Sequence, residues 1–222
     1  MTRAWFVTGT DTGVGKTLVS AALLHALALH HPRVVGMKPV AAGAEPHGAG
    51  WANDDVLALR AASTVQVPPE LDNPVLLPDP LSPHIAARRA GVTIDIDHIA
   101  SCYRQLRTLA DAVVVEGAGG FLVPLGEDST GADLAQALAL PVLLVVGLRL
   151  GCLNHSLLTL EAIRARGLVL AGWVANHIDP LMQAQDDNIA YLQRHLRAPM
   201  LARIPFSLAP DPKTIAITVP PA

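Results

Sequence analysis

The sequence is poor in aromatic residues, in charged residues and in cysteine. Of its 222 residues, 4% are aromatic and 16% are charged, and the two cysteines are Cys102 and Cys152. Two cysteines that do not form a C-x-x-C pair cannot build a disulfide framework, which excludes a small disulfide-stapled secreted domain. The low charged fraction excludes a disordered chain and a long coiled coil.

Basic clusters and long apolar runs are also missing. The net charge is −3, from 16 Lys+Arg and 19 Asp+Glu, without a cationic block. Because phosphate neutralisation needs clustered lysines and arginines, we expect no nucleic-acid partner. The longest apolar stretch, residues 138–148, contains Pro141 and is too short to span a bilayer, and a glycine-rich loop within the first ten residues leaves no room for a signal peptide. We therefore expect a cytoplasmic protein with no membrane partner.

Short apolar runs alternate with helical patterns along the chain, in which 51% of the residues are hydrophobic. Runs such as 113–115 and 142–146 are continuously apolar, which is typical of strands covered on both faces. The alternation predicts an α/β fold: a single domain over residues 1–222 with a doubly wound, mostly parallel sheet and helices on both faces. The predicted strands cover residues 5–9, 34–38, 112–116, 142–147, 170–176 and 200–204. The predicted helices cover residues 16–30, 54–62, 83–89, 97–110, 132–139, 154–166 and 185–196.

Two proline-rich stretches interrupt this pattern. Residues 67–83 hold six prolines and residues 207–222 hold four. Because proline removes a backbone donor and fixes φ, we expect the first stretch to be neither helix nor strand but an ordered surface excursion near the ligand. The tail, 207–222, is expected to be irregular.

The strongest motif is a glycine-rich loop between the first strand and the first helix, with the sequence Thr8-Gly9-Thr10-Asp11-Thr12-Gly13-Val14-Gly15-Lys16-Thr17. Glycines let the backbone wrap around phosphate oxygens, and the N–H groups of the helix N-terminus attract the anion. Lys16 can reach the β and γ phosphates, and the Thr17 hydroxyl suits Mg²⁺. The usual loop has glycine where this chain has Thr10, so the motif predicts a variant phosphate loop and a P-loop NTPase-like fold. Asp11 could instead hold the backbone of the loop.

Carboxylates and a second lysine follow at strand and helix ends. Glu116 closes an apolar strand before Gly117, at the end of an open sheet where ligands bind. Asp54 and Asp55 open a helix; each is a candidate metal ligand or only an N-cap or first-turn acid. Lys38 closes the second strand and either aims its ammonium at the phosphates or is an exposed strand-end lysine.

Several motifs together resemble the dethiobiotin synthetase family, in that family's order and spacing, over residues 1 to about 206. Besides the phosphate loop they are Lys38-Pro39-Val40, Ser82-Pro83-His84, Val115-Glu116-Gly117-Ala118-Gly119-Gly120, Gly151-Cys152-Leu153-Asn154-His155 and Ala171-Gly172-Trp173-Val174-Ala175-Asn176.

The resemblance implies an ATP-dependent ligase that forms C–N bonds to close a ring. The expected reaction carboxylates 7,8-diaminopelargonic acid with CO₂ and closes a cyclic urea, through a carbamate and a carbamic–phosphoric anhydride. The products would be dethiobiotin, ADP and phosphate. The expected cofactor is Mg²⁺ with ATP as co-substrate, and the expected partner is a second copy of the chain in a homodimer.

The resemblance also implies residue roles. Thr17, Asp55 and Glu116 are the expected Mg²⁺ ligands, and Lys16, Lys38 and Thr12 are the expected catalytic residues. The expected nucleotide contacts are Gly13, Val14, Gly15, Lys16, Thr17, Leu18, Asp55, Glu116, Gly117, Ala118, Gly119, Asn176, His177, Pro205, Phe206 and Ser207. The expected substrate contacts are Lys38, Ala42, Gly151, Cys152, Leu153 and Asn154. The last four resemble a segment that reaches into the neighbouring subunit's site.

Two positions depart from the family's pattern. Ala42 stands where some members carry a hydroxyl residue, and His177 stands where an acid is familiar, which leaves the nucleotide preference open. Two other classes are less favoured. An amide ligase of the cobyrinic-acid synthase kind needs a glutamine-hydrolysing domain, for which 222 residues leave no room. A dimeric nucleotide switch of the MinD or ParA kind usually has a second lysine near Thr10 or Asp11, and this loop lacks it.

Overall fold

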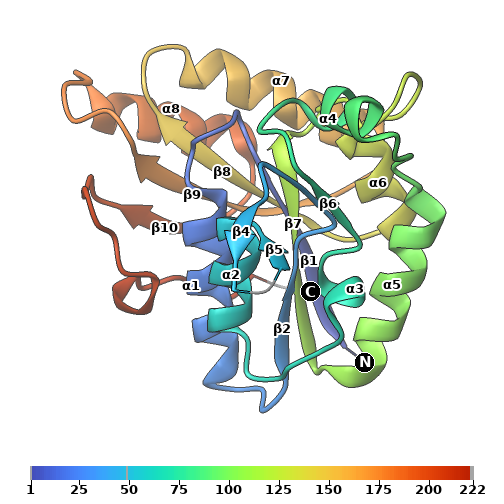
Figure 1. The fold of residues 1–222 in the computed structure, drawn as a ribbon. Helices are drawn as coiled ribbons and strands as arrows, with labels where there is room; N and C mark the ends of the chain where they lie inside the picture. Colours follow the sequence, from blue (N-terminus) through green and yellow to red (C-terminus); the bar gives the residue numbers. More distant parts are fainter. Residues whose placement is uncertain (1, 49, 221–222) are drawn as a thin grey trace.

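A parallel sheet forms the centre of the molecule (Figure 1). The computed structural model describes residues 2–48 and 50–220. Within these residues six strands pair in the order β10-β9-β8-β1-β7-β2, and every pairing between them is parallel. The strands are β1 (Arg3–Gly9), β2 (Val34–Met37), β7 (Ala112–Gly120), β8 (Val142–Leu148), β9 (Leu170–His177) and β10 (Met200–Ile204). The predicted α/β class is confirmed.

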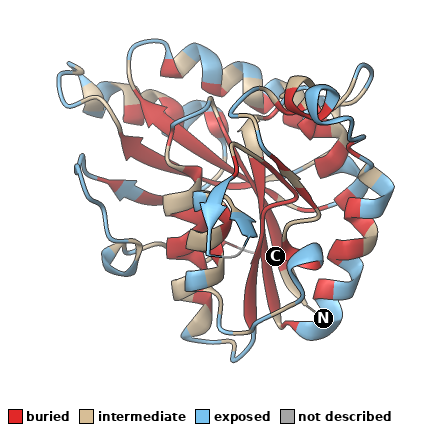
Figure 2. Cartoon of the chain, viewed as in Figure 1, coloured by how far each residue is buried: buried red, intermediate tan, exposed pale blue. Residues whose placement is uncertain are grey.

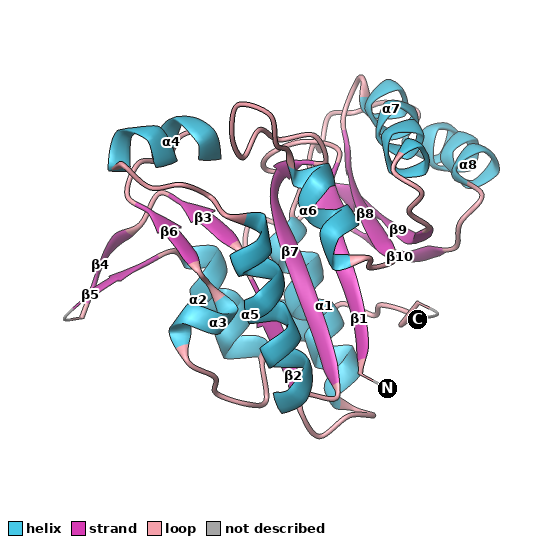
Figure 3. Cartoon of the chain, turned by 90° about the vertical axis from the view of Figure 1, so that its right-hand side faces the viewer, coloured by secondary structure: helices cyan, strands magenta, loops and turns pink. Residues whose placement is uncertain are grey.

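Helices cover both faces of the sheet. Because side chains alternate along a strand, Trp5 and Val7 of β1 pack with α1 (Lys16–Ala28) and α2 (Asp54–Ala62), and Phe6 packs with the helices of the other face. On that face α5 (Ile96–Leu109) and α6 (Gly131–Leu138) share a core cluster with Phe6, whereas α7 (Cys152–Ala165) and α8 (Gln185–Leu196) share one with β8 and β9. In Figure 3, α7 and α8 lie beside each other at the β9–β10 end. None of the helices in the described part has the length and hydropathy needed to cross a bilayer.

Burial explains the sequence patterns of the central strands. All seven residues of β8 are buried, and Figure 2 shows the sheet as the buried centre of the molecule. A strand with helices on both faces can be apolar at every position, which is why 142–146 has no alternation. Helix α1 is buried at consecutive positions such as Ser20, Ala21 and Ala22, as its lack of charge after Lys16 predicted.

The irregular path predicted for residues 67–83 is wrong. This stretch contains α3 (Pro69–Asp72) and β6 (Val75–Leu77), and it leads into α4 (Pro83–Ala90). Pro69 occupies the first turn of α3, where a missing N–H costs nothing, and β6 pairs in parallel with β3 (Val40–Ala42) in a separate two-stranded sheet. A second missed pair, β4 (Glu45–His47) and β5 (Gly50–Ala52), is an exposed hairpin that projects from the body in Figure 3.

Other boundaries moved by a few residues. Strand β7 continues to Gly120 instead of ending at Glu116, and α7 begins at Cys152 instead of at 154. The tail is irregular apart from the short 3-10 helix η1 (Pro212–Thr214), as predicted, while residues 221 and 222 lie outside the described residues. The tail is nonetheless anchored, because Thr218 N donates to the Leu201 carbonyl at 2.9 Å.

Candidate active site

The phosphate loop joins β1 to α1 and contains two glycines with left-handed backbones. Gly13 has φ 74° and Gly15 has φ 89°, a region in which residues with a Cβ are strained. Gly15 is also the N-cap of α1, so the loop ends at a helix terminus whose N–H groups attract anions. From β9, Asn176 Nδ2 donates to the Val14 carbonyl at 2.8 Å and holds the loop against the sheet. The loop therefore has the backbone that phosphate binding requires.

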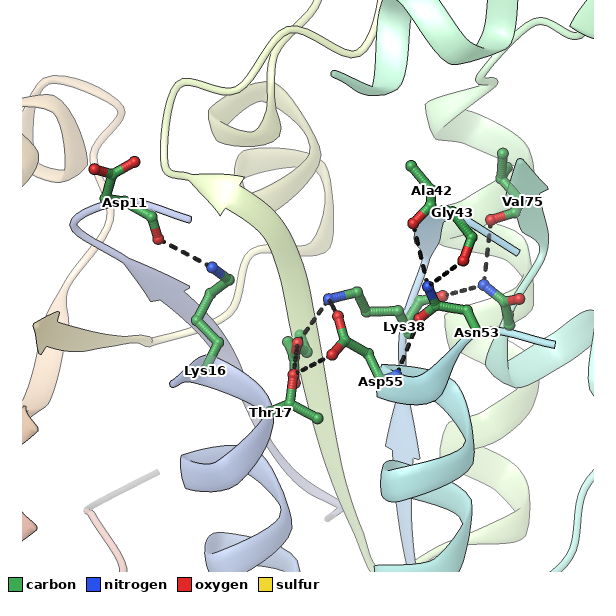
Figure 4. A network of polar contacts seen from close by, with 11 residues as sticks. Asp11, Lys16, Thr17, Lys38, Ala42, Gly43, Asn53, Asp55 and Val75 are labelled. Atoms are coloured by element: carbon green, nitrogen blue, oxygen red, sulfur yellow. Dashed lines mark hydrogen bonds and ion pairs between the residues drawn. The ribbon is translucent and has the colours of Figure 1, made fainter. Parts of the chain in front are cut away.

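Lys16 is buried at the start of α1 and contacts the backbone of its own loop. Its Nζ donates to the Asp11 carbonyl oxygen at 3.1 Å, as Figure 4 shows. Burial lowers the pKa of Lys16, and the positive charge of Lys38 lowers it further. A phosphate on this loop would stabilise the ammonium form, because an anion nearby opposes both effects.

Asp11 holds the loop from the other side. Its Oδ1 accepts a hydrogen bond from Thr12 N at 2.7 Å, so the reading of Asp11 as a support of the loop backbone is confirmed. Its Oδ2 forms an ion pair with Arg149, which follows β8. The phosphate loop is thus tied to the segment that leads into α7.

Four polar side chains from separate parts of the chain meet where the strands end (Figure 4). Thr17 Oγ1 lies 2.7 Å from Asp55 Oδ1 and 2.9 Å from Glu116 Oε1. Lys38 Nζ donates to Asp55 Oδ2 at 2.8 Å and to Glu116 Oε1 at 2.6 Å. The structure therefore brings the three predicted metal ligands and Lys38 together. Since the Lys38 side chain is 4% exposed, its alternative interpretation as an exposed strand-end lysine is wrong.

The charges of this cluster stabilise one another. Burial disfavours the Lys38 ammonium, but attraction by Glu116 and Asp55 outweighs burial, so the pKa of Lys38 is raised. Burial likewise disfavours the Asp55 carboxylate, but the charge and hydrogen bond of Lys38 outweigh it, so the pKa of Asp55 is lowered. Both groups are charged throughout the neutral pH range.

Glycines shape the strand beside Glu116. Val7 and Gly9 of β1 pair with Glu116 and Gly120 of β7, so the residues between them bulge from the ladder. A Cβ at Gly117 would lie 3.0 Å from the Phe6 ring. Ala118 and Gly119 line the cavity next to the polar cluster.

The oxygen ligands fit a hard divalent cation. Thr17 offers a hydroxyl, and Asp55 and Glu116 each offer a carboxylate oxygen within hydrogen-bond distance of that hydroxyl. Glu116 is fully buried and its Oε2 has no hydrogen-bond partner, which is unusual for a buried carboxylate oxygen. The described residues contain no group of three or more His, Cys, Asp or Glu that could hold a metal. A cation here would therefore need further oxygen ligands from a nucleotide or water.

The cluster opens into a cavity of about 840 Å³. Thr12, Lys16 and Lys38 line it together with apolar residues of β3, of the segment before α4 and of the first position of α4. Those apolar residues are Val40, Ala42, Pro80, Leu81 and Pro83. Part of the proline-rich stretch thus lies at the cavity, as the sequence predicted. The cavity has lysines and the phosphate loop on one part of its wall and apolar residues on another.

Among the expected nucleotide contacts, Asn176 and residues 205–207 are those expected to contact the base. Asn176 is bound to the Val14 carbonyl, whereas residues 205–207 and His177 line two other cavities. His177, Pro205 and Phe206 line one of about 460 Å³, and Pro205 and Ser207 line one of about 380 Å³. His177 is buried: Arg203 Nε donates to its Nε2 at 2.9 Å, and its Nδ1 lies 2.7 Å from Gln185 Oε1. Since Nε2 accepts, Nδ1 carries the proton and donates to Gln185.

The predicted substrate segment 151–154 lies away from the 840 Å³ cavity, whose lining includes none of its residues. Gly151 has φ 96° and is the N-cap of α7; Cys152, Leu153 and Asn154 form the first turn. Burial raises the pKa of the Cys152 thiol, which makes it a poor nucleophile. Within one chain this segment is linked to the phosphate loop through Arg149.

The chain matches the AAA_26 family model, described as an AAA domain, over residues 3–214. It is 52% identical over 219 residues to the ATP-dependent dethiobiotin synthetase BioD of Aromatoleum aromaticum, covering 98% of this chain and 96% of that protein. It is 54% identical over 215 residues to BioD of Janthinobacterium sp. strain Marseille, covering 95% and 91%. The chain belongs to the dethiobiotin synthetase family. The resemblance carried by its motifs is confirmed.

The fold of this dethiobiotin synthetase family member also occurs in the septum site-determining protein MinD and in a ParA family ATPase. MinD with Mg-ADP from Pyrococcus horikoshii has a TM-score of 0.59 at 18% identity, covering 92% of this chain and 82% of that one. A ParA family ATPase from Chlorobium tepidum has a TM-score of 0.57 at 15% identity, covering 94% and 86%. At these identities the similarity shows the fold alone, and it confirms the predicted P-loop NTPase-like class.

Sequence reasoning missed several residues that support the site in this family member. Asn53 is the N-cap of α2, with its Oδ1 accepting from Asp55 N at 3.0 Å, so Asp54 and Asp55 are first-turn acids and neither is the cap. The preference for asparagine at N-caps was the signal that could have found Asn53. Asn73 and Arg149 carry no such signal, because their partners lie far away in the sequence.

Proposed function

We propose that this chain carries out ATP- and Mg²⁺-dependent formation of dethiobiotin from 7,8-diaminopelargonic acid and CO₂. The observation that carries the proposal is the meeting of Thr17, Lys38, Asp55 and Glu116 beside a phosphate loop. It occurs in a chain more than half identical to two dethiobiotin synthetases. We also propose that residues 1–222 act as one domain and that the enzyme is cytoplasmic.

The proposed carboxylation and ring closure proceed in three steps. One substrate amine adds to CO₂ and loses a proton, which gives a carbamate. A carbamate oxygen then attacks the γ-phosphorus of ATP, ADP leaves, and a carbamic–phosphoric anhydride results. The second amine attacks the carbonyl carbon, phosphate leaves with the bridging oxygen, and the ring closes as a cyclic urea with loss of a proton.

Cations and N–H groups on the cavity wall supply the catalysis. Lys16 and Lys38 both line the cavity, and together they balance the negative charge of carbamate and γ-phosphate. Thr12 lies on the same wall and is a further contact to the phosphate or the substrate. The chain uses positioning and charge stabilisation and needs no covalent intermediate on the protein.

Thr17, Asp55 and Glu116 would hold Mg²⁺, and the buried unpaired Oε2 of Glu116 supports this assignment. A bound Mg²⁺ neutralises phosphate charge and orients the phosphates. The remaining nucleotide contacts are proposed to run from Gly13 to Leu18 and from Glu116 to Gly119. Asn176, His177 and the residues from Pro205 to Ser207 are proposed to contact the base. Ala42 is proposed to contact the substrate through its backbone.

A homodimer completes the proposal, with residues Gly151, Cys152, Leu153 and Asn154 contributing to the partner's substrate site. Its support is an apolar surface near α7, where Leu122 is 52% exposed and Leu158 is 56% exposed beside a cavity of about 480 Å³. The molar mass from light scattering, compared with that of Leu158→Glu, tests the dimer. A wild-type monomer at assay concentrations would contradict it.

The test of the function is phosphate release from ATP with Mg²⁺ and bicarbonate, with and without 7,8-diaminopelargonic acid. Mass spectrometry of the same samples detects dethiobiotin. Phosphate release that depends on the diamine, with equimolar dethiobiotin, is the expected result. Slow hydrolysis without the diamine and without product would contradict the ligase function and would favour a nucleotide switch.

A further inference from the structure

Two asparagine amides hold the two ends of the segment that carries Lys38. This segment, residues 38–43, runs from Lys38 through β3 to Gly43 and supplies Lys38, Val40 and Ala42 to the 840 Å³ cavity. Asn73 Nδ2 donates to the Lys38 carbonyl at 2.7 Å and to the Val75 carbonyl at 3.2 Å. At the other end, Asn53 Nδ2 donates to the Ala42 and Gly43 carbonyls at 3.2 Å each. Figure 4 shows both sets of contacts.

The Lys38 end is fixed through its backbone as well as its ammonium. Lys38 N donates to the Asp72 carbonyl at 2.8 Å, and Asn73 binds the carbonyl of the same residue. Asp72 is itself held by Arg60 of α2, whose Nε and Nη2 donate to its two carboxylate oxygens at 2.7 and 2.6 Å. Helix α2 therefore supports Lys38 twice, through Arg60 and Asp72 at the backbone and through Asp55 at the ammonium.

The Ala42 end is tied to the proposed metal site by a single side chain. Asn53 caps α2 through its Oδ1, which accepts from the backbone N–H of Asp55, while its Nδ2 holds the Ala42 and Gly43 carbonyls. The oxygen of the Asn53 amide thus fixes the backbone of Asp55, and the nitrogen of the same amide fixes the cavity wall at Ala42.

The segment needs these side chains because its backbone pairing is short. Strand β3 has three residues, and among the described strands its one partner is β6, outside the main sheet. A carbonyl that is shielded from water and has no donor is costly, so the two amides satisfy part-buried carbonyls of residues 38, 42 and 43 that the short ladder leaves unpaired. Pro39 also has no N–H, which removes one backbone bond at the start of the segment.

We propose that Asn53 and Asn73 are positioning residues of the reaction: they hold residues 38–43 so that the Lys38 ammonium and the wall at Ala42 meet the carbamate and phosphate together. This proposal rests on the proposed function. Neither residue touches the reacting groups, and both act through the segment between them. A displacement of about 1 Å of a catalytic group can cost about 100-fold in rate.

The decisive variants are Asn53→Asp and Asn73→Asp. Aspartate has nearly the shape of asparagine but cannot donate to the carbonyls. Aspartate is as good an N-cap as asparagine, so Asn53→Asp keeps the start of α2, replaces the donor to the carbonyls of residues 42 and 43 by an acceptor, and adds one negative charge. Gln105→Glu, an exposed amide-to-acid change on α5, is the matched control for the added charge. Asn73→Ser keeps one hydroxyl donor and tests partial rescue.

Steady-state kinetics, MgATP affinity and hydrogen exchange are measured for all four variants and the wild type. We expect both aspartate variants to lower kcat by about 10- to 100-fold while the Kd for MgATP changes by less than about twofold. Exchange over residues 38–43 should accelerate, Asn73→Ser should fall between wild type and Asn73→Asp, and Gln105→Glu should match the wild type. An unchanged kcat would overturn the proposal. So would a fall in kcat that is accompanied by a similar fold-loss of MgATP affinity and by a lower melting temperature, because that pattern indicates general destabilisation.

Failure of the proposed function has a different signature. If the wild type forms no dethiobiotin, the function is wrong whatever the variants do. Hydrogen exchange then decides alone whether the two amides fix the position of residues 38–43. Faster exchange over these residues in the aspartate variants supports that role, and unchanged exchange overturns it.

Discussion

The ammonium of Lys38 lies 2.6 Å from Oε1 of Glu116, and the two side chains are 4% and 0% exposed. Such a pair is stable only while both charges are present, because the desolvation of each is offset by the other. Asp55 adds a second acceptor at 2.8 Å from the same ammonium. Lys38 therefore neutralises the carboxylates that are proposed to hold Mg²⁺, as well as being proposed to act in catalysis.

Lys38→Ala should make the stability of the protein depend on Mg²⁺. Removing one partner of a buried ion pair costs about 3–5 kcal/mol, because an uncompensated charge remains. Urea unfolding with and without Mg²⁺ measures this, and added Mg²⁺ should recover part of the loss in the variant but change the wild type less. Arg33→Ala is the control: it removes a surface ion pair with Asp111, which solvent screens, and should destabilise the protein much less, with no dependence on Mg²⁺.

The same variant tests catalysis. Lys38→Ala should lose most of its turnover even where Mg²⁺ restores the fold, because the charge opposite the carbamate and phosphate is gone. Near-wild-type turnover in a normally folded variant would contradict a catalytic role for Lys38.

Glu116→Gln and Asp54→Asn separate a metal ligand from a helix-start acid. Glu116 is buried among Thr17 and Lys38, whereas Asp54 is exposed in the first turn of α2. The glutamine keeps the shape but loses the charge, so Mg²⁺-dependent turnover should fall strongly and the Mg²⁺ concentration for half-maximal rate should rise. Asp54→Asn should change both little, with about 0.3–1 kcal/mol lost from the helix-dipole interaction at most. Equal effects of the two changes would contradict the ligand assignment.

Gly15→Ala should damage nucleotide binding far more than Gly13→Ala. Both glycines have left-handed backbones, so both changes carry the strain of about 1–2 kcal/mol for a residue with a Cβ. A Cβ at Gly15 would also lie 2.3 Å from Asn176 Nδ2, whereas one at Gly13 would have nothing within 4 Å. Asn176 would have to leave the Val14 carbonyl, and the loop would lose its support from β9. Titration with a fluorescent ATP analogue measures both affinities, and similar losses would show that backbone strain alone matters.

The parts of the fold that could be predicted from the sequence are those with long local signals. The continuous apolar run of β8 and the lack of charge in α1 after Lys16 can be read from consecutive residues. The helices over residues 54–62 and 185–196 begin and end where the sequence placed them. The three-residue strands β3 and β6 have no such signal, because pairing between Val40 and Val75 depends on contacts 35 positions apart. The six prolines of residues 67–83 also argued against a strand there, because proline lacks the backbone N–H that pairing uses.

The candidate site divides in the same way. Gly15, Lys16 and Thr17 are adjacent in the chain, so a motif records them. The contact of Lys38 with Glu116 spans 78 positions, and the place of Lys38 at the end of a predicted strand left two readings open: an ammonium aimed at the phosphates or an exposed strand-end lysine. Asn73 donates to the Lys38 carbonyl. The sequence could not predict this contact, because it does not show which carbonyls the short β3–β6 pairing leaves without a donor.

Lys16 should take up protons when nucleotide binds at alkaline pH. Its pKa is lowered from 10.5 by burial and by Lys38, so just below pH 10.5 the free enzyme binds fewer protons at this site than the unfolded chain, and stability rises with pH there. Bound phosphates would raise the pKa of Lys16 again. Calorimetry of MgATP binding in two buffers of different ionisation enthalpy measures the uptake. Lys38, with a raised pKa, stays protonated and adds nothing.

Lys16→Arg is the control for this uptake, because a guanidinium keeps its charge and does not titrate in that range. The variant should bind MgATP without taking up protons, and the difference from the wild type should disappear toward neutral pH, where Lys16 is protonated in both states. The sign is the critical point: proton release on binding, or equal uptake by the wild type and Lys16→Arg, would mean that the phosphates do not approach the Lys16 ammonium.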